Sequence, residues 1–354
     1  MPAWAKAAAE VGRVAFLLPG LLTAYNVRLA MHFPENLVGR SNAKGAVMSN
    51  EEGEVPASLT WSAARAQVGS TRRAARPTED SEATAPRVLA VRDLWVGLAR
   101  WNLWALLGWQ DIKQRYRRSL LGPFWLTLSM GVMVGALGVL YGALFGLAVA
   151  DYLPFLCLGF IAWGFISGTV NDGCVAFIES ENFIRQIRLP FSTFVYRLIW
   201  RNLIILGHNF AVFVVVAVVF GIWPGWAGLL LVPGLVLICA TGGWVSLLLG
   251  MICARFRDVP QIVASLMQVA FFLTPIIWKP ELLANRAGFV QINPFYHYVE
   301  LIRAPLHVEL IRAPLLGTEP GALSWAVALG ATGVGWLVTF LFFCRFRSRI
   351  AYWV

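Results

Sequence analysis

The sequence predicts an all-α integral membrane protein with six transmembrane helices and both termini in the cytoplasm. Of its 354 residues, 58% are hydrophobic and only 14% are charged, whereas soluble domains carry about 25% charged residues. Long uncharged runs recur along the chain, and each approaches the roughly 20 helical residues that a bilayer core of about 30 Å requires. Arginines and lysines gather at alternate ends of these runs, which is the positive-inside pattern.

Residues 1–92 differ from the rest and are predicted to be a poorly structured N-terminal extension. The apolar run 14–22 is too short to cross a bilayer. The stretch 44–86 is rich in Ala, Ser, Thr, Glu, Arg and Pro, as disordered tails are. Met48 begins a sequence, MSNEEGEVP, that suits a cytoplasmic start. We interpret residues 1–47 as an over-long start or as an extension that membrane insertion does not need.

Residues 93–118 are predicted to form a cytoplasmic amphipathic helix that lies in the membrane interface. Apolar residues such as Leu94, Leu98 and Trp101 recur at a spacing of three to four, but Arg100 and Gln110 interrupt them. A segment of this polarity suits the interface better than the bilayer core. A short additional transmembrane helix is the alternative.

Residues 119–354 are predicted to form the membrane domain. The six predicted spans cover residues 123–147, 153–170, 202–223, 226–253, 259–278 and 322–344. The connections assigned to the inside hold thirteen arginines and lysines, whereas those assigned to the outside hold four, all in the loop 279–320. Because cytoplasmic loops carry the excess of cations, this distribution places both termini inside.

The outer loop between the fifth and sixth spans contains a short duplication. VELIRAPL occurs at residues 299–306 and again at 308–315. Both copies have apolar content and end in Pro-Leu, so we predict short re-entrant helices that dip into the outer leaflet. Backbone at that depth must be buried against protein.

The sequence carries no pattern of catalytic or metal-binding residues. None of its four lysines follows the glycine of a phosphate-cradling loop. Its five cysteines are scattered, without the spacing of a metal site or a disulfide framework. The predicted spans hold no carboxylate of the kind that proton relays use. We therefore expect that this chain is not an enzyme and that it binds no metal and no cofactor. The net charge of +10 lies at helix ends, so a nucleic-acid partner is not expected.

Six ordered motifs carry a resemblance to a known family. They are DIKQRYRRSLLGPFW (111–125), ENFIRQIRLP (181–190), RFRD (255–258), TPIIW (274–278), NPFYHYVELIRAPL (293–306) and RIAYWV (349–354). Over residues 93–354 the chain resembles the permease subunit of bacterial polysaccharide-exporting ABC transporters, which export O-antigen, capsule or teichoic acid chains. The duplicated VELIRAPL departs from the family pattern and leaves the geometry of the outer gate open.

The resemblance implies a multi-pass protein of the bacterial inner membrane that pairs as a homodimer. It also implies two copies of a separate P-loop ATPase, which would bind the ATP and Mg. Residues 179–188 would be the coupling helix seated in a groove of that ATPase, and a plain cytoplasmic loop is the alternative. The residues implied in coupling are Glu179, Glu181, Asn182, Arg185 and Arg188, with Arg257 and Asp258 as a second contact.

The substrate that the resemblance implies is a sugar polymer on a polyprenyl pyrophosphate. Arg115, Arg117 and Arg118 would pair with the pyrophosphate, although topology and headgroup contact also explain them. Aromatic rings would let sugar rings slide along the path, or they are simply core and lipid-facing residues; the candidates are Tyr141, Phe145, Phe160, Trp163, Phe272 and Trp278. An ATP-independent flippase of lipid-linked sugars and a membrane glycosyl- or acyltransferase are the competing functions.

Overall fold

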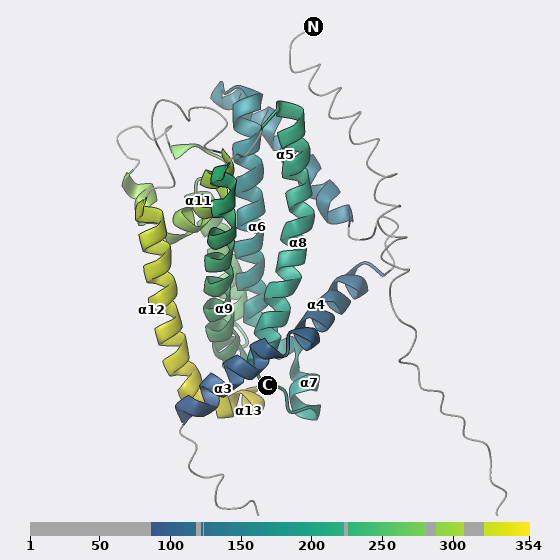
Figure 1. The fold of residues 1–354 in the computed structure, drawn as a ribbon, viewed down its shortest axis with the longest axis vertical. Coiled ribbons are helices and arrows are strands. Elements are labelled where there is room, and N and C mark those ends of the chain that lie inside the picture. The colour runs from purple at the N-terminus through teal and green to yellow at the C-terminus, as the bar shows by residue number, and fades with distance from the viewer. Residues whose placement is uncertain (1–85, 118–121, 123, 223–225, 281–287, 308–321) are drawn as a thin grey trace, which may run out of the picture. The chain divides into compact units, whose positions relative to one another are not determined.

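The part of the chain that the structure describes consists of helices and their connections (Figure 1). The computed structural model describes residues 86–117, 122, 124–222, 226–280, 288–307 and 322–354. In chain order the helices are α3 (Pro86–Ala99), α4 (Trp101–Arg115), α5 (Phe124–Phe145), α6 (Val149–Glu179), α7 (Glu181–Gln186), α8 (Ser192–Phe220), α9 (Leu231–Arg255), α10 (Val259–Leu273), α11 (Pro294–His307), α12 (Ala322–Phe346) and α13 (Ile350–Trp353). The 3-10 turns η2 (Trp226–Leu230) and η5 (Arg347–Arg349) lead into α9 and α13.

Five of the described helical segments are long and apolar enough to cross a membrane. They are α5, α6, α8, the segment Gly228–Arg255 and the segment Ala322–Trp353. The fifth predicted span, 259–278, is shorter than expected, because α10 ends at Leu273. At 1.5 Å per residue α10 is about 22 Å long, less than a bilayer core. The chain is thus a multi-pass all-α membrane protein in which one of the six predicted spans is too short to cross by itself.

The early end of α10 has a local cause. Pro275 disfavours the helical conformation of the residue before it, and Thr274 is accordingly extended. The Thr274 hydroxyl donates to the carbonyl of Ala270 at 2.8 Å and accepts from the Asn293 amide at 3.0 Å. These bonds fix the end of α10 to the chain that leads into α11.

Helix α6 lies at the centre of the bundle and is longer than predicted. The predicted turn at residues 171–173 is absent, and the helix continues to Glu179. The Asp172 carboxylate remains satisfied there because it accepts from the Asn202 amide at 2.8 Å and pairs with Arg201 at 2.9 Å. A Cβ on Gly173 would lie 2.7 Å from the Cα of Ser246, so α6 and α9 touch through small residues.

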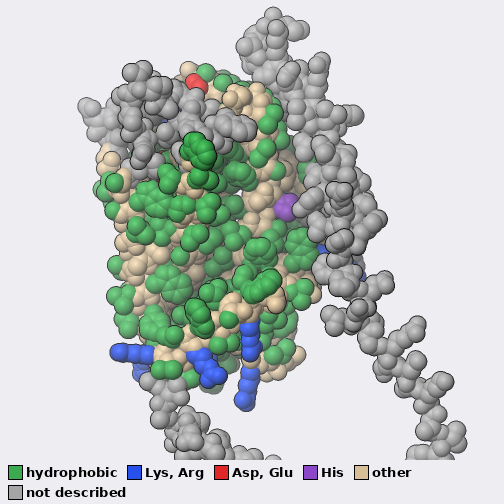
Figure 2. All heavy atoms as spheres, in the orientation of Figure 1, with side chains coloured by type: hydrophobic (Ala, Val, Ile, Leu, Met, Phe, Trp, Pro, Cys, Tyr) green, Lys and Arg blue, Asp and Glu red, His purple; other side chains and the backbone are tan. Residues whose placement is uncertain are grey.

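The two ends of the bundle differ in charge. Lysine and arginine side chains gather at the lower end in Figure 2, where α3, α7 and α13 lie in Figure 1. We call this the arginine-rich end. Helix α11 lies towards the opposite end, which we call the α11 end. This distribution agrees with the predicted charge asymmetry.

The single interfacial helix expected over residues 93–118 is two helices. The helical part begins at Pro86, before the expected boundary at residue 93, and it breaks at Arg100, where ψ is 46°. Both helices approach α8 through a glycine: a Cβ on Gly97 would overlap the Ser192 hydroxyl, and one on Gly108 would lie 3.0 Å from the carbonyl of Arg197. The bend at Arg100 lets both glycines reach the same stretch of α8.

Asp93 fixes α3 to the rest of the bundle. Its buried carboxylate accepts hydrogen bonds from the backbone amides of Phe191 at 3.2 Å and Ser192 at 3.0 Å. These amides stand at the start of α8, where no carbonyl of the helix can reach them. The same carboxylate pairs with Arg347 at 2.9 Å, so one side chain joins α3, α8 and η5.

We expect Asp93→Asn to lower the free energy of unfolding by about 2 kcal/mol. The amide keeps the shape of the side chain but removes the charge that Arg347 and the α8 amides face, and hydrogen bonds to charged groups are the stronger ones. Thermal unfolding of the detergent-solubilised protein measures the change. Asp151→Asn is the control, since Asp151 stands in the first turn of α6 and is only half-buried. Equal effects of the two substitutions would contradict this role of Asp93.

Some predictions fall outside the described residues. They concern the N-terminal extension up to residue 85, Arg118 and the second VELIRAPL copy at 308–315. The first copy lies in the second half of α11, and its residues 301–306 are buried. The structure thus places this part of the outer loop inside the bundle.

Candidate functional site

Three segments that are far apart in the sequence meet at the arginine-rich end. They are α7 with the residues after it (181–188), the turn between α9 and α10 (255–258), and the end of the described chain (345–354). The Arg185 guanidinium donates to the backbone oxygen of Val354 at 3.0 Å. The Arg257 guanidinium donates to the backbone oxygen of Trp353 at 3.4 Å. We call these three segments together the basal surface.

The basal surface contains all but one of the residues expected to couple the chain to an ATPase. Glu179 stands just outside it, as the exposed last residue of α6. Glu181 and Arg185 form an ion pair at 2.8 Å on α7, and both are partly exposed. The remaining four are exposed: Asn182, Arg188, Arg257 and Asp258. The motif at residues 349–354 was identified in the sequence, but its contact with Arg185 and Arg257 was not predicted, because backbone acceptors leave no signal in a sequence.

A network of charged side chains ties α4 to α8 and α6. Asp111 accepts from the Arg197 Nε at 2.7 Å and lies 3.5 Å from Arg201, which also pairs with Asp172 at 2.9 Å. Sequence reasoning assigned Arg197 and Arg201 to topology alone. Their spacing of four residues places them on one face of α8, which could have indicated a shared carboxylate partner.

The predicted pyrophosphate contacts lie at the end of α4. Arg115 is the last residue of α4, Arg117 follows it, and both are exposed. Arg118 lies outside the described residues. Their role towards a phosphate group stays a prediction.

The predicted aromatic residues form two groups rather than one continuous row. In the first group the rings of Tyr141 and Phe145 stack with centroids 5.6 Å apart, and Phe145 contacts Tyr152 of α6. In the second group Phe160 and Trp163 each lie 5.8 Å from Phe271.

The second group continues to the α11 end. Phe271 also contacts Phe272, and Trp163 contacts Phe295 at the start of α11. The indole of Trp278 donates to the carbonyl of Phe272 at 3.2 Å. Sequence reasoning named Trp163 and Phe272 but missed Phe271, which contacts three of the other rings.

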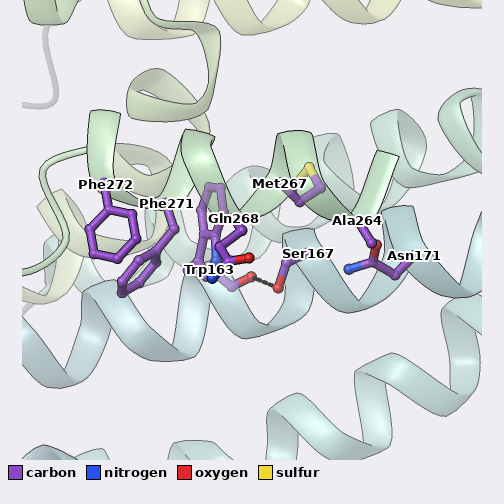
Figure 3. A pocket seen from close by; sticks show the side chains of 8 residues that line it. All are labelled: Trp163, Ser167, Asn171, Ala264, Met267, Gln268, Phe271 and Phe272. Carbon is purple, nitrogen blue, oxygen red and sulfur yellow. Dashed lines mark hydrogen bonds between the residues drawn. The ribbon is translucent and has the colours of Figure 1, made fainter. Parts of the chain in front are cut away.

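A groove of about 400 Å³ runs between α6 and α10 beside this second group (Figure 3). Its lining residues are Trp163, Ser167 and Asn171 of α6 and Ala264, Met267, Gln268, Phe271 and Phe272 of α10. Phe271 and Phe272 line one end, Trp163 and Gln268 lie in the middle, and Asn171 lies at the other end (Figure 3). The Ser167 hydroxyl donates to the carbonyl of Trp163 at 2.8 Å. Apolar walls with a few polar groups are typical of ligand sites, and so is this volume.

The two amides distinguish this groove from a lipid-facing surface. Within the described part of the chain, the side chains of Asn171 and Gln268 have no hydrogen-bond partner, and Gln268 is exposed. An amide without a partner is costly in hydrocarbon, where no water can satisfy it. The groove therefore suits contact with water, with a polar ligand or with another chain better than contact with lipid tails.

Potential metal-ligating side chains are scattered among the described residues. No group of three or more His, Cys, Asp or Glu among them is placed to hold a metal ion.

Comparisons with known proteins place these features within a family. The family model described as "ABC-2 type transporter" matches residues 102–306, which include α7, the groove and most of α4 and α11. The O-antigen export system permease protein RfbA of Myxococcus xanthus is 26% identical over 193 residues, which are 52% of this chain and 72% of that protein. An RfbA of Klebsiella pneumoniae is 23% identical over 194 residues, with the same coverage of both chains.

Proposed function

The chain belongs to the ABC-2 type transporter family, and we propose that it is the membrane subunit of an exporter of lipid-linked polysaccharide. The polymer would be an O-antigen, a capsular polysaccharide or a related chain on polyprenyl pyrophosphate. Relatives named as O-antigen export permeases support this substrate class. The protein would lie in the bacterial inner membrane with its arginine-rich end in the cytoplasm, as the positive-inside pattern favours.

The groove between α6 and α10 is the observation that carries the proposal. A sugar ring has an apolar face that packs on aromatic side chains, and hydroxyl groups that bond to amides. The groove supplies the rings of Trp163, Phe271 and Phe272 and the amides of Asn171 and Gln268. It runs along α6 and α10, so a polymer lying in it would follow two helices of the bundle.

Two further components complete the proposal. ATP and Mg would bind to a separate ATPase, because the chain contains no phosphate-cradling loop. A second copy of the chain would cover the groove, since the side-chain amides of Asn171 and Gln268 that line it are costly to expose to lipid tails. The homodimer and two ATPase subunits would then enclose one path.

Reconstitution tests this function. We expect proteoliposomes that hold the permease together with a P-loop ATPase of the polysaccharide-exporting ABC class from the same organism to move a labelled polyprenyl-pyrophosphate oligosaccharide across the bilayer only with ATP and Mg. Translocation by the permease alone would contradict the proposal and support an ATP-independent flippase. Hydrolysis or transfer of the sugar would support an enzyme instead.

We expect Phe272→Ala to slow transport about tenfold with little effect on folding. The ring is 63% exposed, so its removal leaves the core intact, whereas loss of a stacking contact of about 1.4 kcal/mol corresponds to a factor of ten. Leu266→Ala is the matched control, since Leu266 is 62% exposed on the same helix and does not line the groove. Initial rates in the same proteoliposomes give both values. Equal rates for the two variants would exclude Phe272 from the path.

A further inference from the structure

We infer that residues 345–354 form part of the surface on which an acidic partner protein docks, together with α7 and the α9–α10 turn. The inference rests on the proposed function, under which that partner is the ATPase subunit. It extends the predicted contacts at residues 179–188 and 257–258 to a third segment of the chain.

The end of the chain has a fixed orientation. Ile350 and Val354 are 0% and 5% exposed, and they pack with Phe177, Met251 and Phe343 in a core at the arginine-rich end. Residues four apart lie on one face of a helical turn, so the face between them is directed away from this core. Tyr352 on that face is 87% exposed.

Two hydrogen bonds join this segment to both predicted coupling contacts. Arg185 of α7 bonds to the backbone oxygen of Val354, and Arg257 of the α9–α10 turn bonds to the backbone oxygen of Trp353. The three segments are therefore held as one surface. A partner that seats α7 would meet Tyr352 and Arg349 at the same time.

The composition of the basal surface indicates the chemistry of its partner. It holds seven arginines, of which Arg347 is paired with Asp93, and only two acidic side chains, Glu181 and Asp258, so its excess charge is positive. Exposed apolar side chains belong to the same surface: Ile187 is 50% exposed, Phe256 is 55% exposed and Tyr352 is 87% exposed. Arginine and aromatic residues are enriched at the centres of protein interfaces, and complementary potentials would make the partner's surface acidic.

The depth of the basal surface favours a protein over lipid headgroups. Helix α6 has 31 residues, so it is about 46 Å long at 1.5 Å per residue. A bilayer with its headgroups is about 40–45 Å thick. If α6 begins at the outer interface, its last residue, Glu179, reaches the aqueous phase. The basal surface, which begins with α7 two residues later, is then presented to soluble partners.

Binding of the partner ATPase to the purified permease tests the inference. The probe is a P-loop ATPase of the polysaccharide-exporting ABC class from the same organism, titrated against detergent-solubilised permease on a biosensor. We expect Tyr352→Ala to weaken binding about tenfold, as loss of an exposed interface tyrosine does. We expect Arg349→Glu to weaken it as well and to reduce the dependence of binding on salt. Trp226→Ala is the matched control, since Trp226 is 88% exposed and lies outside the basal surface.

The outcomes separate the inference from the proposed function. Weaker binding of both variants, with wild-type binding of Trp226→Ala and unchanged thermal unfolding, supports the inference. Wild-type binding by both variants overturns the inference and leaves the proposed function standing. A wild-type permease that does not bind the ATPase overturns both. If Tyr352→Ala keeps its affinity for the ATPase and instead loses binding to anionic vesicles, the surface contacts lipid and the inference is wrong.

Discussion

Arg303→Ala is expected to lower the free energy of unfolding by about 3–5 kcal/mol, the cost of removing one partner from a buried ion pair. Arg303 is only 2% exposed although it carries a charge. Its guanidinium pairs with Glu300 at 3.0 Å and donates to the carbonyl of Pro275 at 2.8 Å. It also lies 3.8 Å from the ring centroid of Phe155. Alanine would leave the Glu300 carboxylate and the Pro275 carbonyl without these donors.

The position of Arg303 explains why its removal should cost so much stability. The Pro275 carbonyl belongs to the non-helical chain after α10, so Arg303 joins α11 to that chain and to α6. A backbone carbonyl at membrane depth must be satisfied by protein. Unfolding of the detergent-solubilised variant, by heat or by added SDS, measures the effect.

Two variants control this experiment. Arg303→Lys keeps the charge but not the planar fork that reaches two acceptors, so it should fall between wild type and Arg303→Ala. Arg188→Ala removes an exposed arginine and should change stability by less than about 0.5 kcal/mol. If Arg303→Ala also changes the free energy of unfolding by less than about 0.5 kcal/mol, other contacts hold the α10–α11 junction.

Hydropathy and charge were sufficient to predict the class of fold. The runs that form α5, α8 and α12 are uncharged over most of their length, and long apolar runs of this kind are what a helix needs to cross a bilayer. The end of α6 could not be placed in the same way. Asn171-Asp172-Gly173 reads as a turn when polar residues are taken as exposed, but Arg201 and Asn202 of α8 satisfy Asp172 inside the bundle. A partner that lies 30 residues away in the sequence cannot be recognised from the local pattern of residues.

The candidate site was predicted in part for a similar reason. Exposed charged residues on α7 were identifiable because a short polar segment between two apolar runs must lie outside the bilayer. The groove was not identifiable, since Asn171 and Gln268 lie on helices that meet only in the folded chain. The same holds for Arg303, which was counted with the cations of the outer loop and is in fact buried.

Glu179→Ala combined with Arg185→Ala is expected to abolish export while the permease stays inserted and folded. The Arg185 side chain is 61% exposed and its partner Glu181 is 40% exposed, so their ion pair contributes at most about 1 kcal/mol to stability. Glu179 is exposed at the end of α6. If these charges are buried against the ATPase, each truncation removes a contact worth about 2–5 kcal/mol. A loss of only about 2.8 kcal/mol already weakens binding a hundredfold.

Co-purification of the ATPase and appearance of polymer at the cell surface measure the effect of the double variant. Arg92→Ala combined with Asp151→Ala is the matched control, because it also removes one guanidinium and one carboxylate. Arg92 lies on α3 and Asp151 in the first turn of α6, so both stand outside the basal surface. We expect this control to export polymer at the wild-type rate. Undiminished export by a stably expressed Glu179→Ala, Arg185→Ala variant would show that ATP hydrolysis is coupled to transport through other residues. The charge network of Asp111, Arg197 and Arg201 would then be the next group of residues to test.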